Sequence, residues 1–192
     1  MEINPKYLTL FKDTRYYIVT GGRGSGKSYS INTLLCMLMG EVGHTILFTR
    51  YTLRSAAISI IPEFVDKIEL FNAFNDFIIT KEELVDENIF DTIDLSVRQK
   101  GIQNRVIMIM NPATKEHFIY KRFFEQAGVQ EGLNHSKGDV TYIHTTYIDN
   151  KENLSQSYIN QIEHIKKTNL PKYEHIILGG WLDKAEGVVF TN

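Results

Sequence analysis

The sequence is poor in cysteine and in long apolar runs, and each shortage excludes a class of protein. Cys36 is the only cysteine among 192 residues, so a disulfide framework is excluded and a reducing cytoplasm is favoured. The apolar runs are far shorter than the roughly 20 residues that a membrane-spanning helix needs. No basic, apolar and small-residue sequence opens the chain. We therefore expect a cytoplasmic protein that has no membrane partner.

The sequence also lacks an excess of charge of either sign. The formal net charge is −2, so we do not expect a broad basic surface for nucleic acid, and any DNA contact would be local or shared among subunits. The 6 histidines are scattered without the spacing of a zinc site. With 43% apolar residues, 23% charged residues and only 4 prolines, the composition is that of an ordinary globular protein. We predict a single domain over residues 1–192.

Apolar runs alternate with helical periods, which predicts an α/β fold with a mostly parallel sheet flanked by helices. The predicted strands are Tyr16–Thr20, Thr45–Thr49, Asp76–Thr80, Arg105–Met110 and Val140–Thr145. The predicted helices run from Lys27 to about Gly40, from Leu53 to Leu70, from Glu87 to Gln99, through HFIYKRFF, and from Ser155 to Thr168. The most apolar strand, Arg105–Met110, is expected at the centre of the sheet.

The stretch GGRGSGKS matches the phosphate-binding pattern G-x-x-x-x-G-K-[ST], with a predicted strand before it and a helix after it. Its glycines permit backbone angles that turn successive N–H groups toward an anion, and the helix adds its positive N-terminal end. We therefore predict that the loop binds ATP. The predicted nucleotide-binding residues are Gly21, Gly22, Arg23, Gly24, Ser25, Gly26, Lys27, Ser28 and Tyr29.

Three side chains of this loop are candidates for chemistry. We expect Lys27 to reach the β- and γ-phosphates and the Ser28 hydroxyl to ligate Mg²⁺. Arg23 is a cation inside the loop, which could swing toward charge that develops on the γ-phosphate. A solvated loop arginine is the alternative, and the residues alone leave both open.

Asn111 ends the apolar strand VIMIM and is followed by Pro112. The carboxyl ends of parallel strands are where ligands bind in open α/β folds, so the amide could sense a γ-phosphate or position the attacking water. Asn and Pro are also favoured in ordinary turns. The spacing does not separate these two interpretations.

Four separated segments, GGRGSGKS, IMNPATKEHFIYKRFF, TTYIDNKENL and LGGWLDKAEGVVF, resemble phage terminase large subunits, in particular the PBSX-like branch. The resemblance implies a P-loop NTPase domain of the additional-strand type, an ATP hydrolase that uses ATP and Mg²⁺ to pump viral DNA into a procapsid. It also implies as partners double-stranded DNA, a portal protein, a small terminase subunit and a homo-oligomeric ring, in the cytoplasm of a host cell. A nuclease domain follows in intact family members, and this sequence ends where that domain would begin.

The same resemblance implies roles for individual residues. It makes Gly21–Ser28 the ATP loop, Arg23 an arginine finger that acts in cis, and Asn111 the tip of the motif that couples hydrolysis to movement. Segments before and after the strands carry further candidates. Asn4, Tyr7 and Arg15 precede the first strand, where related ATPases contact adenine, although simple packing is the alternative. Arg50 and Arg54 could contact nucleotide, DNA or a neighbouring subunit, and a solvated helix start is the alternative. Asp149 and Asn150 are structural or close to the nucleotide.

One expected motif does not match. Terminases have a strand that ends in two adjacent acidic residues, followed by Ala and by Glu-Glu-Leu at a helix start. Glu82 and Glu83 match that helix start, but Ile79 and Thr80 stand where the acidic pair belongs. We infer that a segment between about Thr80 and Lys81 is missing. Alternatively, Glu82 or Glu83 supplies the catalytic carboxylate in a shifted register.

The mismatch predicts a chain that binds ATP or ADP but hydrolyses ATP poorly. The alternative from another class is a non-hydrolysing nucleotide-binding remnant that serves as an assembly or interaction module. A small-molecule kinase would need an arginine-rich lid, and no such segment is seen.

Overall fold

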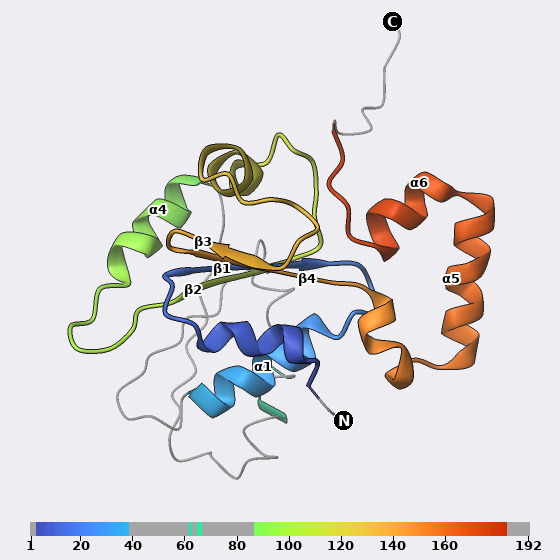
Figure 1. Ribbon diagram of the computed structural model, residues 1–192, viewed down its shortest axis with the longest axis horizontal. Helices are drawn as coiled ribbons and strands as arrows, with labels where there is room; N and C mark the ends of the chain where they lie inside the picture. The colour runs from blue at the N-terminus through green and yellow to red at the C-terminus, as the bar shows by residue number, and fades with distance from the viewer. Residues whose placement is uncertain (1–2, 39–61, 63–64, 67–86, 184–192) are drawn as a thin grey trace, which may run out of the picture. The chain divides into compact units, whose positions relative to one another are not determined.

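The computed structural model describes residues 3–38, 62, 65–66 and 87–183 (Figure 1). These residues divide into two compact units. The first unit combines the chain up to Lys27 with the chain from Ile107 onward, and the second runs from Ser28 to Val106. No helix in the described ranges is long and apolar enough to cross a membrane.

The first unit is built on a four-stranded sheet in the order β2–β1–β4–β3. The strands are β1 (Tyr16–Gly21), β2 (Val106–Met110), β3 (His135–Lys137) and β4 (Val140–Thr145). β1 and β4 run parallel and β3 runs antiparallel to β4, so the sheet is mixed and mostly parallel. Three predicted strands are thereby confirmed. β3 was not predicted, because three residues, two of them exposed, give no periodic signal.

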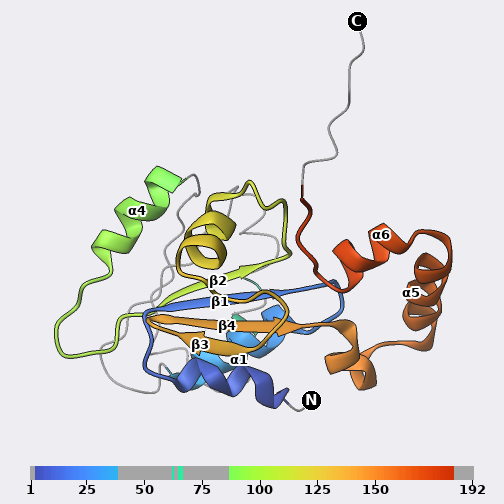
Figure 2. The same ribbon diagram turned by 45° about the horizontal axis from the view of Figure 1, so that its top comes forward.

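β1 is covered on both faces, as expected for an inner parallel strand. Its residues Tyr17, Ile18 and Val19 have no exposed surface. The 3₁₀-helix η1 (Pro5–Phe11) covers one face and the π-helix η4 (Tyr120–Gln126) covers the other (Figures 1 and 2). The helix predicted in HFIYKRFF is thus confirmed, with π geometry. Each buried aliphatic side chain of this core stabilises the fold by about 1.5–3 kcal/mol.

A helical segment extends past the carboxyl ends of β1 and β4 (Figure 2). It comprises η5 (Tyr147–Asn153), α5 (Gln156–Thr168), α6 (Leu170–Lys172) and η6 (Tyr173–Ile177). α5 begins after Ser155, whose Oγ accepts a hydrogen bond from the N–H of Tyr158, and the predicted helix is confirmed. A small core of four buried side chains holds the segment together: Tyr147, Ile162, Tyr173 and Ile177.

The second unit contains α1 (Lys27–Leu38) from Ser28 onward and α4 (Glu87–Ser96). α1 begins where the sequence predicts, and four of its apolar side chains are buried at helical spacing: Ile31, Leu34, Leu35 and Leu38. α4 is also confirmed as a helix. Ile89 is 41% exposed, and Phe90 is the buried residue of the helix.

Several predictions fall outside the described residues. These are the strands Thr45–Thr49 and Asp76–Thr80, the arginines Arg50 and Arg54, the acidic residues Glu82 and Glu83, and most of the helix Leu53–Leu70, of which Pro62, Val65 and Asp66 are helical. β2 is outermost among the described strands. Its expected place at the centre of the sheet therefore stays a prediction.

The half-buried His144 on β4 gives the fold a predicted acid sensitivity. Its Nδ1 lies 2.8 Å from Oγ1 of Thr20 on β1. Burial lowers the pKa of His144 below its usual 6.5, and Lys27 acts in the same direction. As pH falls below about 6.5, the histidine of the unfolded chain is protonated before that of the folded chain. The free energy of unfolding therefore decreases until the pH has fallen below the folded-state pKa of His144.

We expect His144→Gln to lose less stability than the wild type between pH 7.5 and 5.5, because glutamine does not titrate. The measurement is the melting temperature at both pH values. His164→Gln, on the exposed side of α5, is the matched control and should keep the wild-type drop. An equal drop in all three proteins would show that His144 does not carry this sensitivity.

Candidate functional site

The glycine-rich loop lies at the carboxyl edge of the sheet. Gly21 ends β1 and pairs with Thr145, the last residue of β4, and α1 begins at Lys27. The loop therefore has the strand–loop–helix setting that the sequence predicts. In open α/β folds this edge of the sheet is the place where ligands bind.

Glycine is required at particular positions of the loop. Gly24 and Gly26 have φ values of 80° and 74°, a left-handed conformation that residues with a side chain rarely adopt. At Gly22 a Cβ atom would lie 1.6 Å from the carbonyl oxygen of Ile177, so no side chain fits there. Left-handed residues within a turn make successive N–H groups converge on one point, which creates a site for an anion.

The ammonium group of Lys27 is held by four neutral oxygens. Its Nζ donates to the carbonyl oxygens of Gly21 at 2.8 Å and Gly22 at 2.9 Å, to Oγ of Ser25 at 3.2 Å, and to Oδ1 of Asn111 at 3.0 Å. Burial lowers the pKa of Lys27 to about 8. A neighbouring oxyanion would favour the charged form again, so this environment fits a phosphate group.

Asn111 lies where the sequence places it, directly after β2 at the carboxyl edge of the sheet. The hydrogen bond from Lys27 to its Oδ1 brings together two predicted site residues that are 84 positions apart. Of the two interpretations that the spacing left open, the contact with the loop lysine favours a side chain that belongs to the site.

η6 and the chain that follows it support the loop and the Asn111 turn through backbone contacts. The N–H of Arg23 donates to the carbonyl oxygen of Ile176 at 2.9 Å, and the N–H of Leu182 donates to the carbonyl oxygen of Ala113 at 2.9 Å. Between them, a Cβ on Gly179 would lie 2.4 Å from the carbonyl carbon of Gly21. The motif LGGWL therefore packs its glycine backbone directly against the loop.

The remaining predicted site residues are placed as follows. The side chain of Arg23 is exposed, so its proposed movement toward a γ-phosphate stays a prediction. Ser28 and Tyr29 belong to the first turn of α1 in the second unit, where Ser28 is exposed. In the described ranges, no group of three or more His, Cys, Asp or Glu side chains could hold a metal ion.

Two side chains that the sequence named only as general candidates contact the backbone of the loop. Tyr7 on η1 donates its hydroxyl to the carbonyl oxygen of Ser25 at 3.3 Å. Asn150 on η5 donates its amide to the carbonyl oxygen of Gly24 at 2.9 Å. The only signal for Asn150 was its place after a strand that ends at the same edge. For Tyr7 there was none beyond its place before the first strand.

The other candidates before the first strand separate in space. Asn4 donates its amide to the carbonyl oxygen of Asp149 at 3.0 Å, so it lies beside η5. Arg15 precedes β1 at the opposite end of the strand, where its N–H donates to Oδ1 of Asp139 at 2.6 Å. Arg15 therefore lies away from the loop, and its expected contact with adenine stays a prediction.

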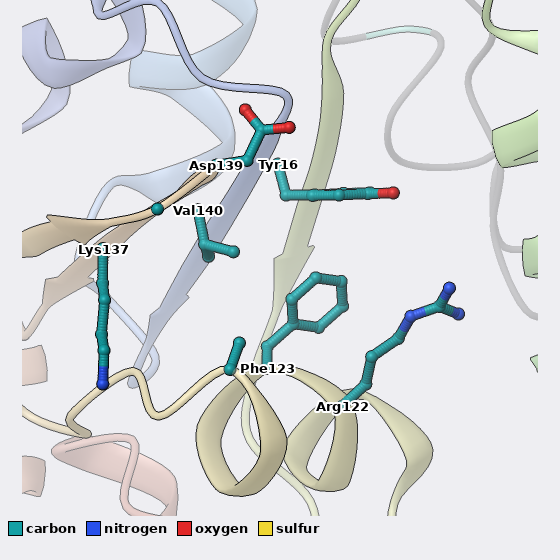
Figure 3. Close-up of a pocket in the computed structure, with 8 residues that line it drawn as sticks. Tyr16, Arg122, Phe123, Lys137, Asp139 and Val140 are labelled. Carbon is teal, nitrogen blue, oxygen red and sulfur yellow. The ribbon is translucent and has the colours of Figure 1, made fainter.

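An open cavity of about 470 Å³ lies at that opposite, amino-terminal edge. Figure 3 shows it between the first residues of β1 and β4, Tyr16 and Val140, and the helix that carries Arg122 and Phe123. Because it lies at the other end of the parallel strands, it is not part of the loop site.

The chain is similar to known proteins in family and in fold. The family model described as phage terminase large subunit matches residues 63–180, which is more than half of the chain. Among curated proteins, none matches. Solved structures of the large terminase from a thermophilic bacteriophage are similar at 14% identity, which shows a common fold.

One crystal form of that terminase has a TM-score of 0.64, and this match covers 95% of our chain and 54% of the other. Its complex with ATP-γ-S has a TM-score of 0.67, with coverage of 94% and 53%. Its complex with ADP has a TM-score of 0.68, with coverage of 94% and 54%. Our chain thus spans about half the length of these terminases. From the family match, the chain belongs to the phage terminase large subunit family.

Proposed function

We propose that this chain is the ATPase domain, of the additional-strand P-loop class, of a motor that packages phage DNA into a procapsid. The observation that carries the proposal is the Lys27 ammonium, which bridges the glycine loop and Asn111 through hydrogen bonds. A phosphate-binding loop that contacts a second strand end can link the presence of a nucleotide to the position of that strand end. The structures of the thermophilic phage terminase with ATP-γ-S and ADP support a nucleotide as the ligand.

In the proposed complex the loop N–H groups cup the phosphates, and Lys27 turns from the loop carbonyls toward the β- and γ-phosphates. The exposed Ser28 hydroxyl, next to Lys27 at the start of α1, would ligate Mg²⁺, a cation that takes oxygen ligands. The ion would neutralise charge on the phosphate oxygens. Arg23 is exposed in the same loop and would approach the γ-phosphate as charge develops there.

Asn111 is proposed to report the nucleotide state. Lys27 shares its hydrogen bonds between Asn111 and the loop, and a bound γ-phosphate would compete for the same N–H groups. Loss of that phosphate would return Lys27 to Asn111. Double-stranded DNA, a portal protein, a small terminase subunit and a homo-oligomeric ring are the partners that family membership suggests for the movement that follows.

Hydrolysis by this chain is proposed to be slow, because Ile79 and Thr80 stand where the family has its acidic pair. Glu82 or Glu83 would act as the base only if the register is shifted so that a carboxylate reaches the attacking water. The second candidate function, a nucleotide-binding remnant that acts as an assembly module, is favoured by the same mismatch.

Lys27→Ala tests the nucleotide site. We expect the variant to bind Mg²⁺–ATP about 30-fold more weakly, because charge-assisted hydrogen bonds of the ammonium contribute about 2 kcal/mol. Calorimetric titration gives both affinities. Lys167→Ala, on the exposed end of α5, should bind like the wild type. Equal affinity of wild type and Lys27→Ala would contradict the proposed site.

The rate of phosphate release distinguishes a packaging motor from a non-hydrolysing nucleotide-binding remnant. We expect the wild-type chain to bind ATP with a turnover below about 1 s⁻¹, the lower end for kinase-like phosphoryl transfer. Release of phosphate is measured with and without double-stranded DNA, with Lys27→Ala as background. A faster turnover would refute impaired hydrolysis. Stimulation by DNA would favour the motor over the remnant.

Asn111→Asp probes the bond between Lys27 and Asn111. A carboxylate 3.0 Å from the ammonium should raise the melting temperature of the nucleotide-free protein and weaken ATP binding about 10-fold. The reason is that the triphosphate must then compete with a charged partner and meets a like charge. Asn111→Ala lacks the added charge and should not show the increase in melting temperature. Unchanged affinity in Asn111→Asp would place Asn111 outside the site.

A further inference from the structure

Two side chains donate hydrogen bonds to backbone carbonyl oxygens in the middle of the loop, and they come from distant parts of the sequence. The hydroxyl of Tyr7 donates to the carbonyl oxygen of Ser25 at 3.3 Å. The amide of Asn150 donates to the carbonyl oxygen of Gly24 at 2.9 Å. These carbonyls belong to consecutive peptide units in the middle of GGRGSGKS.

A carbonyl that is fixed in direction also fixes the N–H of the same peptide unit. In a planar trans peptide the C=O and N–H bonds point in opposite directions. The bond from Asn150 therefore turns the N–H of Ser25 away from Asn150, and the bond from Tyr7 turns the N–H of Gly26 away from Tyr7. The positive φ angles of Gly24 and Gly26 curve the chain so that such N–H groups converge on an anion.

We propose that Tyr7 and Asn150 are positioning residues of the phosphate cup, which keep the N–H groups of Ser25 and Gly26 turned toward the polyphosphate before it binds. The inference rests on the proposed nucleotide site and adds two residues to it. Donors that are oriented in advance bind more tightly, because the ligand does not have to order them.

Each of the two side chains is itself held in place. Tyr7 has no exposed surface, and its hydroxyl also lies 2.7 Å from Oγ1 of Thr145, the residue that pairs with Gly21. Burial raises the pKa of Tyr7 to about 12, so the hydroxyl keeps the proton that it donates.

Asn150 lies at a kink inside η5, where its backbone leaves helical geometry at φ −131° and ψ 15°. Its Oδ1 accepts a hydrogen bond from Nδ2 of Asn153 at 3.0 Å, which orients the amide. The side chain also packs against the loop, since a Cβ on Gly26 would lie 3.2 Å from Cγ of Asn150. Any larger residue at position 26 would press on it.

The competing interpretation is that these residues contact the base of the nucleotide. Full burial of Tyr7 under the loop and the use of its hydroxyl within the protein argue against it. Pyrophosphate distinguishes the two roles, because it has phosphate groups but no base.

The test compares Tyr7→Phe and Asn150→Ala with two matched controls in the full chain. Tyr17→Phe removes the hydroxyl of another fully buried tyrosine, which donates to the carbonyl of Lys12 away from the loop. Asn160→Ala removes an exposed amide on α5 that accepts a hydrogen bond from Gln156. Calorimetry with pyrophosphate and with Mg²⁺–ADP is combined with melting curves and amide hydrogen exchange of the ligand-free proteins.

We expect Tyr7→Phe and Asn150→Ala each to weaken both pyrophosphate and ADP by about 3- to 10-fold, the range for one lost hydrogen bond. Exchange at the amides of Ser25 and Gly26 should become faster in these two variants. Both controls should keep wild-type affinities and loop exchange, although Tyr17→Phe should melt earlier, as Tyr7→Phe does.

Wild-type pyrophosphate affinity in both variants, with or without weaker ADP binding, would overturn the positioning role. Unchanged exchange at Ser25 and Gly26 would do the same. These outcomes leave the nucleotide site standing. A wild-type chain that binds neither ADP nor ATP would instead overturn the proposed function itself.

Discussion

The site depends on one partly buried ammonium group. Lys27 stands at the end of the glycine loop, and its Nζ donates to oxygens of the loop and of Asn111. Partial burial lowers the pKa of Lys27, and a cation removed from water attracts an anion more strongly than an exposed lysine would. The same hydrogen bonds join the loop after β1 to the strand end of β2, so a ligand that attracts the ammonium acts on both.

Segments far away in the sequence hold that arrangement. η1 contributes Tyr7, the kink in η5 contributes Asn150, η6 contributes the carbonyl of Ile176, and the chain after η6 contributes Gly179. Each of them contacts the loop backbone, and none of them carries a charge to an anion. Their common effect is to fix the directions of the peptide units in the loop. Those directions determine whether the N–H groups of a glycine-rich loop converge on one point.

Much of the fold could be predicted from local patterns. β1, β4, α1 and α5 lie where apolar periods and caps place them, because strand alternation and helical spacing are set by neighbours in the chain. Other features could not be predicted from the sequence. β3 is too short for a pattern, and the apolar spacing of α4 did not reveal that Ile89 is exposed while Phe90 is buried. Burial depends on what packs against a helix, and its own sequence does not contain that information.

By itself, the sequence determined the glycine-rich loop, its flanking strand and helix, and the place of Asn111 at a strand end. Those features follow from backbone geometry within a few residues of Gly24, Lys27 and Pro112. Only the tertiary structure decided which oxygens surround the Lys27 ammonium and that Arg15 lies at the amino-terminal edge of the sheet. It also decided that Tyr7 and Asn150 donate hydrogen bonds to the loop. Such contacts join residues separated by up to 126 positions, and they exist only after the parallel pairing of β1 and β4 has brought the strand ends together.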